Sequence, residues 1–156
     1  MLCNTDLVTA RSAVLFASLP SNLTTAIMKQ STTKCYKRGE TIFIQGDIAQ
    51  TIFIVLDGWV KLFRITPTGA EAIVGVFTKR LSFGEAVAFE QERYPFTAES
   101  VTDSHLLLVR TSMLTSMMHV HPEIALAMLS STSRHMNALI AQLEQLKAHT
   151  GAQRVA

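Results

Sequence analysis

Short runs of strand-forming residues, separated by turn residues, constrain the fold of this chain most strongly. Between Thr33 and Arg110 the runs are rich in Ile, Val, Phe and Thr, which predicts an all-β roll or barrel. Asp57-Gly58 separates TIFIVL from WVKLFRI, and Asp-Gly favours a type I′ turn, so a hairpin is predicted there. A second turn is predicted to join WVKLFRI to EAIVGVF. The turn residues are Arg38-Gly39, Gly46-Asp47, Asp57-Gly58 and Pro67-Thr68-Gly69.

Helical patterns flank the strand-rich region on both sides. Residues 7–30 carry apolar residues at roughly helical spacing, and Ser21 is predicted to cap a second short helix within them. A short helix is predicted for residues 111–120. His121-Pro122-Glu123 is typical of a helix start, because proline is tolerated in the first turn and an acid lies near the positive end of the dipole. From there a long helix is predicted to about His149, ended by Thr150-Gly151.

The predicted long helix carries a heptad pattern of apolar residues, which has two interpretations. Such a seam joins two helices in a coiled coil, but a short seam is also typical of an amphipathic helix packed on its own domain. We favour a homodimer interface, because one roll cannot easily cover so long an apolar stripe. The predicted interface residues are Leu129, Met136 and Leu143, spaced seven apart, and Thr132, Leu139 and Leu146, three residues after each.

Composition excludes several classes of function. The 156 residues carry a net charge of +2 with 17% charged residues, so the chain lacks the dense basic patch of a nucleic-acid-binding protein. Cys3 and Cys35 cannot hold an iron–sulfur cluster and are predicted to be reduced thiols. The N-terminus lacks a secretion signal, and His119 and Glu123 interrupt the Met-rich stretch, so a cytoplasmic protein without a membrane span is expected.

Five segments stand out along the chain: KRGETIFIQGD (37–47), FIVLDGWVKLFR (53–64), FGEAVAF (83–89), FTAES (96–100) and HPEIALAML (121–129). In their order and spacing, these segments resemble the sensor half of Crp/Fnr-family transcription regulators. The resemblance implies a mainly β fold with α-helices: a double-stranded, jelly-roll-like β-roll of the cyclic-nucleotide-binding-domain type. Residues 1–120 would form the sensor domain, with the roll at about 33–110, and residues 121–150 the dimerisation helix. Residues 151–156 would be a hinge to a helix-turn-helix domain missing from this chain, through which alone DNA would be bound.

The resemblance also implies a cradle for the ribose and phosphate of a small-molecule effector. In members that bind cyclic nucleotides, a glutamate takes the ribose hydroxyl and an arginine, followed by Ser/Thr and Ala, holds the phosphate. Phe96 occupies the arginine position, and phenylalanine cannot pair with a buried anion. Arg93 is an alternative partner from the same loop. The predicted ligand-binding residues are Gly84, Glu85, Ala86, Arg93, Phe96, Thr97, Ala98, and, on the long helix, Leu139 and Ile140.

The predicted effector is therefore not cyclic AMP bound in the usual way. Two interpretations stay open: an apolar ligand, or a core in which Phe96, Leu139 and Ile140 bind nothing. FGEAVAF followed by YPFTAES is more similar to the respiration regulators that detect nitric oxide through haem, which makes haem a candidate cofactor. No spacing selects an axial ligand. The candidates are His105, His119, His121, His135, His149, Cys3, Cys35 and the seven methionines.

Catalysis is not expected. Residues 33–104 contain no histidine, which excludes the metal chemistry of the cupin barrels, and no nucleophile elbow, P-loop or dinucleotide fingerprint is present. The sequence thus predicts a ligand-sensing and dimerising regulatory domain whose effector, bound between roll and long helix, controls a DNA-binding domain. The alternative is a stand-alone cyclic-nucleotide-binding module that regulates a protein partner.

Overall fold

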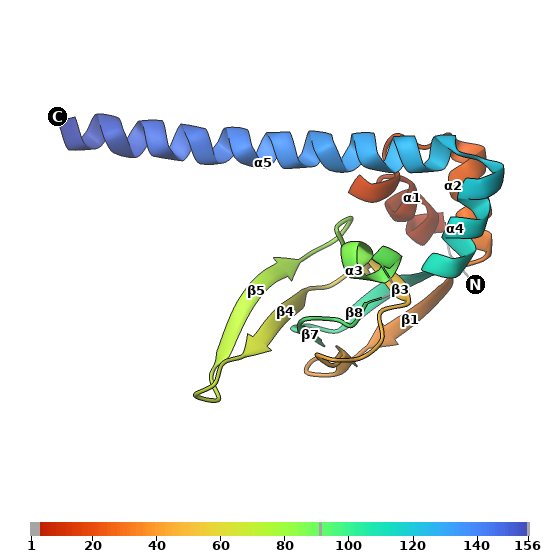
Figure 1. Cartoon of the computed structure of the whole chain (residues 1–156), viewed down its shortest axis with the longest axis horizontal. Helices are drawn as coiled ribbons and strands as arrows, with labels where there is room; N and C mark the ends of the chain where they lie inside the picture. Colours follow the sequence, from red (N-terminus) through yellow and green to blue (C-terminus); the bar gives the residue numbers. More distant parts are fainter. Residues whose placement is uncertain (1–3, 91, 156) are drawn as a thin grey trace.

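Two antiparallel sheets of four strands each pack face to face as a β-roll (Figure 1). The computed structural model describes residues 4–90 and 92–155. The predicted fold class, mainly β with short N-terminal helices and a long C-terminal helix, is confirmed. In the first sheet the order is β1 (Thr32–Tyr36), β8 (Ser104–Arg110), β3 (Thr51–Asp57), β6 (Ser82–Phe83); in the second it is β2 (Thr41–Phe43), β7 (Thr97–Ser100), β4 (Val60–Ile65), β5 (Glu71–Phe77).

The helices gather at one end of the roll, apart from α3 (Glu85–Glu90), which connects β6 to β7. Two hydrogen bonds fix the N-terminal segment to the β5–β6 connection and to α5. Val14 N–H donates to the Arg80 carbonyl, and Ser18 N–H donates to Ser131 Oγ. Ser21 was predicted to cap the second helix, but it is the first residue of that helix. The N-cap is Pro20. The helices are α1 (Asn4–Arg11), the 3-10 turn η1 (Val14–Phe16), α2 (Ser21–Lys29), α4 (Thr111–Val120) and α5 (Glu123–Val155).

Aromatic rings fill the space between the sheets near α3. Phe43 stacks on Tyr94 at 3.7 Å between ring centroids, and Phe53 stacks on Phe83 at 5.2 Å. Phe43 also lies 5.6 Å from Phe53 and 6.1 Å from Phe83, so the two stacks form one cluster. Aromatic pairs at such distances add a specific attraction to the free energy of burial. The cluster joins strands of both sheets to the loop that precedes β7.

The predicted hairpin at Asp57-Gly58 is wrong, because β3 and β4 lie in different sheets. The chain turns a corner there and crosses from one sheet to the other. Gly58 has φ of +94°, and a Cβ on it would lie 2.6 Å from the Asp103 carbonyl oxygen. The corner is held to the β7–β8 connection, since Val101 N–H donates to the Trp59 carbonyl at 2.8 Å. Glycine at position 58 therefore allows the β3–β4 and β7–β8 connections to pack closely against each other.

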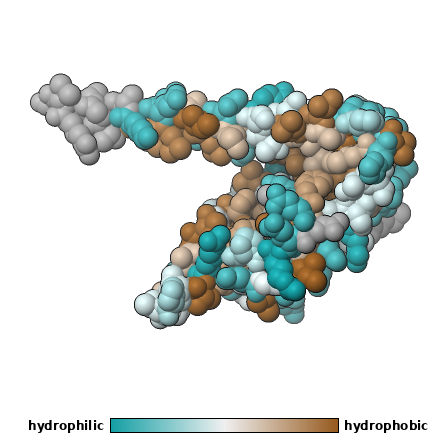
Figure 2. All heavy atoms as spheres, viewed as in Figure 1, coloured by the Kyte–Doolittle hydropathy of each residue, from teal (hydrophilic) through white to brown (hydrophobic). Residues whose placement is uncertain are grey.

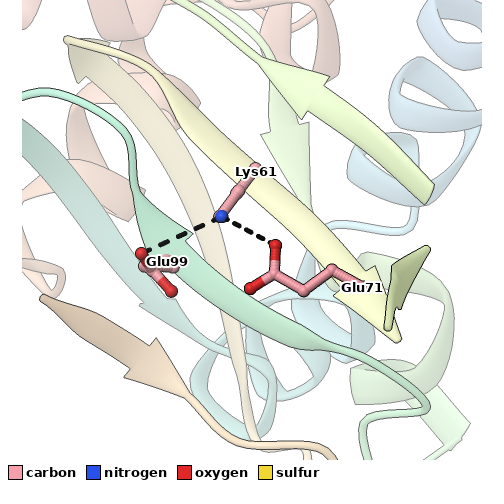
Figure 3. A network of polar contacts seen from close by, with 3 residues as sticks. All are labelled: Lys61, Glu71 and Glu99. Carbon is pink, nitrogen blue, oxygen red and sulfur yellow. Dashed lines mark hydrogen bonds and ion pairs between the residues drawn. The ribbon is translucent and has the colours of Figure 1, made fainter. Parts of the chain in front are cut away.

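The other predicted turn forms the β4–β5 hairpin. Thr66 N–H donates to the Ala70 carbonyl at 2.8 Å, which closes the loop. On the same hairpin Lys61 Nζ lies 3.0 Å from Glu71 Oε2 on β5 and 4.0 Å from Glu99 Oε1 on β7 (Figure 3). The hydrogen bond that Lys61 donates to Glu71 raises the pKa of Lys61, against a smaller opposing effect of desolvation. One cation thus links three neighbouring strands.

Helix α5 begins against the rest of the molecule and then projects beyond it (Figure 1). Its first turns are buried at Ile124, Met128 and Ser131. The helix continues to Val155, past the predicted end at Thr150-Gly151, because a single glycine costs only about 1 kcal/mol in a helix interior. Within residues 4–90 and 92–155 no helix is both long and apolar enough to cross a membrane.

The corner at Gly58 gives the first testable prediction. Gly58→Ala places a methyl group against backbone atoms at a positive φ, so we expect a loss of about 2–4 kcal/mol in the free energy of unfolding, measured by urea denaturation. Gly69→Ala is the matched control, because Gly69 has φ of +87° but open space around it. It should cost only the backbone strain, about 1 kcal/mol. Equal losses in the two variants would contradict the close approach.

Candidate ligand-binding site

Gly84 and Glu85 lie where β6 passes into α3. Gly84 has φ of +86°, and a Cβ on it would lie 3.3 Å from the Tyr94 ring and 3.4 Å from the Thr51 carbonyl oxygen. Tyr94 Oη donates to that same carbonyl at 2.7 Å. Burial raises the pKa of the Tyr94 hydroxyl to about 12, so it remains a donor at neutral pH. Glycine here lets the loop before β7 pack tightly onto β3.

Glu85 is the one charged side chain that turns inward in the cradle. Its Oε2 atom is buried and has no hydrogen-bond partner among the described residues. Burial raises the pKa of the carboxyl, opposed by hydrogen bonds from its own backbone N–H and from the Ser82 side chain. A buried carboxylate oxygen without a donor is costly, so Oε2 favours either a proton or a ligand that donates to it.

The second half of the cradle, at the start of β7, is apolar. Phe96 is half-buried against the core, with its ring 6.0 Å from that of Phe43. Thr97 Oγ1 accepts a hydrogen bond from Gln45 N–H at 3.0 Å, and Ala98 is fully buried. Since Phe83, beside Gly84, also contacts Phe43, the two halves of the cradle meet across that ring. The structure therefore brings the predicted halves together around an aromatic surface.

Arg93 does not turn toward Phe96. Its guanidinium is exposed, and Nη1 donates to the Gly46 carbonyl at 2.7 Å. Gly46 N–H in turn donates to the Tyr94 carbonyl, so the loops that contain these residues hold each other at the surface. Arg93, proposed from the sequence as a substitute for the phosphate-binding arginine, is placed as a structural link between loops.

Leu139 and Ile140 are not brought to the cradle either. Both lie on the projecting part of α5, and each is 47% exposed. Figure 2 shows an open hollow between this part of α5 and the β4–β5 hairpin. Ala86 lies in α3 beside Glu85, as predicted. The predicted site is thus divided in this structure: Gly84 and Phe96 lie on the same aromatic cluster, and the two α5 residues are exposed on the projecting helix.

The candidate axial ligands for haem do not gather at the cradle. His105 Nδ1 lies 3.5 Å from Asp6 Oδ1, and His121 Nδ1 lies 3.3 Å from Glu123 Oε1. His119 and His135 are exposed on α4 and α5, and Cys35 is exposed on β1. Cys3 and the side chain of His149 lie outside the described part of the chain. Across residues 4–90 and 92–155, no three His, Cys, Asp or Glu side chains are grouped to hold a metal ion. The described histidines and Cys35 thus have acidic neighbours or face solvent.

Sequence reasoning missed Tyr94 and Phe43, the residues that build the cradle wall. Each lies in a segment that was singled out for other residues: Phe43 in KRGETIFIQGD and Tyr94 in the loop before FTAES. An aromatic residue directly before Pro95 was the available signal, because a large ring in a short loop has to pack against something. Spacing alone could not show that the two rings stack.

Glu85 gives a prediction for pH dependence. Because burial raises its pKa in the folded state, the stability from the protonated form is present below the ordinary value of 4.5 and is lost as the pH rises through the folded-state pKa. Glu85→Gln should therefore gain stability relative to wild type as the pH rises above 4.5, by about 1.4 kcal/mol per unit of pKa difference. Urea unfolding at several pH values measures this, with exposed Glu90→Gln as the control. A stability difference that does not change with pH would contradict the prediction.

Comparisons with solved structures agree with the fold. A candidate cyclic nucleotide binding protein from Ruegeria pomeroyi is 45% identical, with a TM-score of 0.81 over 93% of this chain and 64% of that chain. The sensor domain of the transcriptional regulator DNR from Pseudomonas aeruginosa is 27% identical, with a TM-score of 0.71 over 86% of this chain and 90% of that chain. The described architecture is therefore shared with both proteins.

Sequence comparisons point to the same domain. The CRP-like cAMP-activated global transcriptional regulator of Mycobacterium tuberculosis is 26% identical over 84% of this chain and 58% of its own length. The lysophospholipase nte1 of Aspergillus fumigatus is 26% identical over 65% of this chain but only 7% of its own length. The chain thus spans little more than half of the regulator and a small part of the enzyme. Residues 33–121 match the family model for the cyclic nucleotide-binding domain. The chain belongs to the cyclic nucleotide-binding domain family, and its homologues include transcription regulators of the Crp/Fnr type.

Proposed function

We propose that this chain is the ligand-sensing and dimerising part of a Crp/Fnr-type transcription regulator. An effector bound at the roll changes the packing of α5, and α5 reorients a helix-turn-helix domain that follows it in the full-length protein. The observation that carries the proposal is the apolar stripe on α5, which the roll leaves uncovered. Regulators among the relatives support the role, whereas the related enzyme shares only a small part of its length with this chain.

The stripe fits a helix-to-helix interface between two copies. Leu129 is 64% exposed and Leu143 is 58% exposed, although burying a leucine stabilises a protein by about 1.5–3 kcal/mol. Thr132 Oγ1 donates to the Met128 carbonyl, so this position needs no polar partner across the interface. The competing interpretation, a helix packed on its own domain, holds only for the first turns of α5, where Ile124 and Met128 are buried. The exposed members are Leu129, Thr132, Met136, Leu139, Leu143 and Leu146.

The proposed effector is apolar and carries no anionic group that the cradle must neutralise. Phe96 presents a ring where a phosphate would need a cation, and Arg93 is bound to Gly46. The buried Glu85 oxygen would repel an anion further. Haem is the less favoured apolar ligand, because the described histidines lie away from the cradle contacts. Haem would become the favoured effector if haem reconstitution gave a Soret band and one histidine substitution abolished it.

A few polar contacts join the segment after η1 to the start of α5, and we propose that they act as a switch. Arg134 donates to Ser18 Oγ and Ser18 N–H donates to Ser131 Oγ, so the segment after η1 holds the base of α5. A ligand that binds one packing of this junction more tightly shifts the population toward it. The projecting part of α5 then moves as a rigid body and carries the apolar stripe with it. A cytoplasmic location is expected for such a regulator.

A stand-alone module that regulates a protein partner is the second candidate function. The same stripe favours it, since an apolar helix face can pair with a helix of another protein as well as with its own copy. The two candidates differ in the gene: a helix-turn-helix coding sequence after Ala156 supports the regulator, and a stop codon supports the module.

The dimer interface can be tested with one charge. Leu139→Lys or Leu143→Lys places an ammonium group in the seam, so we expect the dimer dissociation constant to rise at least about 100-fold, measured by sedimentation equilibrium. Asn137→Lys is the matched control, because Asn137 is exposed and lies about 120° or more around the helix from both leucines. Dimers that persist in both leucine variants would contradict the seam.

The ligand specificity can be tested by restoring the missing cation. Gly84, Glu85, Thr97 and Ala98 keep the rest of the cradle, so Phe96→Arg should create cyclic-AMP binding, which calorimetry should not detect in wild type. The expected gain is at least about tenfold in affinity. Phe96→Lys tests whether the planar guanidinium matters, and Phe96→Leu controls for loss of the ring. Tight binding by wild type, abolished by Arg93→Ala, would overturn the apolar effector.

A further inference from the structure

A groove lies between α1, α2 and the start of β1. Its volume is about 630 Å³, which lies within the range of about 300–1,000 Å³ for small-molecule sites. None of the cradle residues lines it. We call it the N-terminal groove, lined by Leu7, Thr25, Met28, Lys29, Ser31, Thr32 and Thr33.

The walls of the N-terminal groove combine apolar and hydroxyl surfaces. Leu7 packs against the core and gives the groove an apolar side, whereas Met28 lies behind it and is only 1% exposed. Ser31 Oγ already donates to the Ile27 carbonyl. Thr32 and Thr33 are successive residues of β1, so their side chains point to opposite faces and only one of the two hydroxyls can face the groove. Neither hydroxyl forms a hydrogen bond with any residue that the structure describes.

Positive charge at the rim has no acidic partner. Lys29 forms no ion pair within residues 4–90 and 92–155. Arg11 adds a second cation beside the groove, since its Nη2 donates to Thr25 Oγ1 at 2.8 Å. Asp6, the acid on the same helix as Arg11, lies 3.5 Å from His105 instead. The groove is therefore apolar inside and cationic at its edge.

We propose that the N-terminal groove binds an amphipathic carboxylate, a medium-length acyl chain with an anionic head. The chain lies along Leu7, and the carboxylate receives charge-assisted hydrogen bonds from Lys29, with one threonine hydroxyl beside it. A neutral alkanol lacks the anionic group, and acetate lacks the chain. This site is separate from the cradle and does not rest on the function proposed for it.

Calorimetric titration of the whole chain with decanoate tests the proposal. Decanoate should bind at one site per chain, more tightly than decanol or acetate by about tenfold or more. Lys29→Gln should weaken decanoate binding about tenfold, whereas Lys37→Gln, which removes the same charge from an exposed residue outside the groove, should leave it unchanged. Thr33→Phe, which fills the groove from a strand position, should abolish binding while the thermal unfolding midpoint shows that the protein is folded.

Three results would overturn the proposal. They are no decanoate binding by the wild-type chain, equal affinity of Lys29→Gln and Lys37→Gln, or binding that survives in folded Thr33→Phe. Binding lost in Leu143→Lys but kept in Lys29→Gln would place decanoate on the exposed stripe of α5, which also contradicts the groove.

Discussion

The ring of Phe43 is the contact on which the rest of the roll depends. It comes from β2 in the second sheet and touches Phe53 and Phe83 in the first sheet, as well as Tyr94 and Phe96 in the segment before β7. One side chain therefore joins both sheets to the loop that completes the cradle. Protein interiors are close-packed, so replacing a buried ring by a charged group in such a cluster is destabilising.

That packing explains the chemistry of the cradle. A phosphate site requires a cation at position 96, yet the ring there continues the aromatic cluster. Glu85 is left as a buried acid with a raised pKa and no donor for one oxygen. The backbone frame of Gly84 and Ala98 is thus a property of the fold, and the side chains on it decide the ligand. A family match therefore describes the frame more firmly than it describes the effector.

The strands, turns and helices could be predicted where local chemistry decides them. Proline and glycine at positions 67 and 69 close a real hairpin, because both neighbouring runs stay in one sheet. Asp57-Gly58 has equally good turn chemistry, but which sheet receives β4 is decided by its long-range pairing with β5 and β7. The helix α5 continues through Gly151, although glycine disfavours a helix interior. Local propensity does not by itself determine which sheet a strand joins or where a helix ends, because tertiary contacts can override it.

The site was predicted in part for a similar reason. Glu85 and Phe96 were found because their positions along the chain are fixed by the fold, whereas the direction of Arg93 depends on the Gly46 carbonyl that it meets. The N-terminal groove has no sequence motif at all. Its residues are ordinary members of α1, α2 and β1, and only their packing gives them a shared surface.

An apolar lever on a narrow base links the roll to its proposed output. Ser131 and Arg134 hold the start of α5 to the segment after η1, and the apolar side chains beyond them are exposed. In the proposed dimer a second helix covers them. The most direct test is a pulsed electron spin resonance measurement on a chain labelled at Gln142→Cys, with both native cysteines replaced by serine. Parallel helices about 8–10 Å apart predict one narrow distribution of label distances below about 30 Å. A decay without dipolar modulation, the signal of isolated chains, would contradict the account.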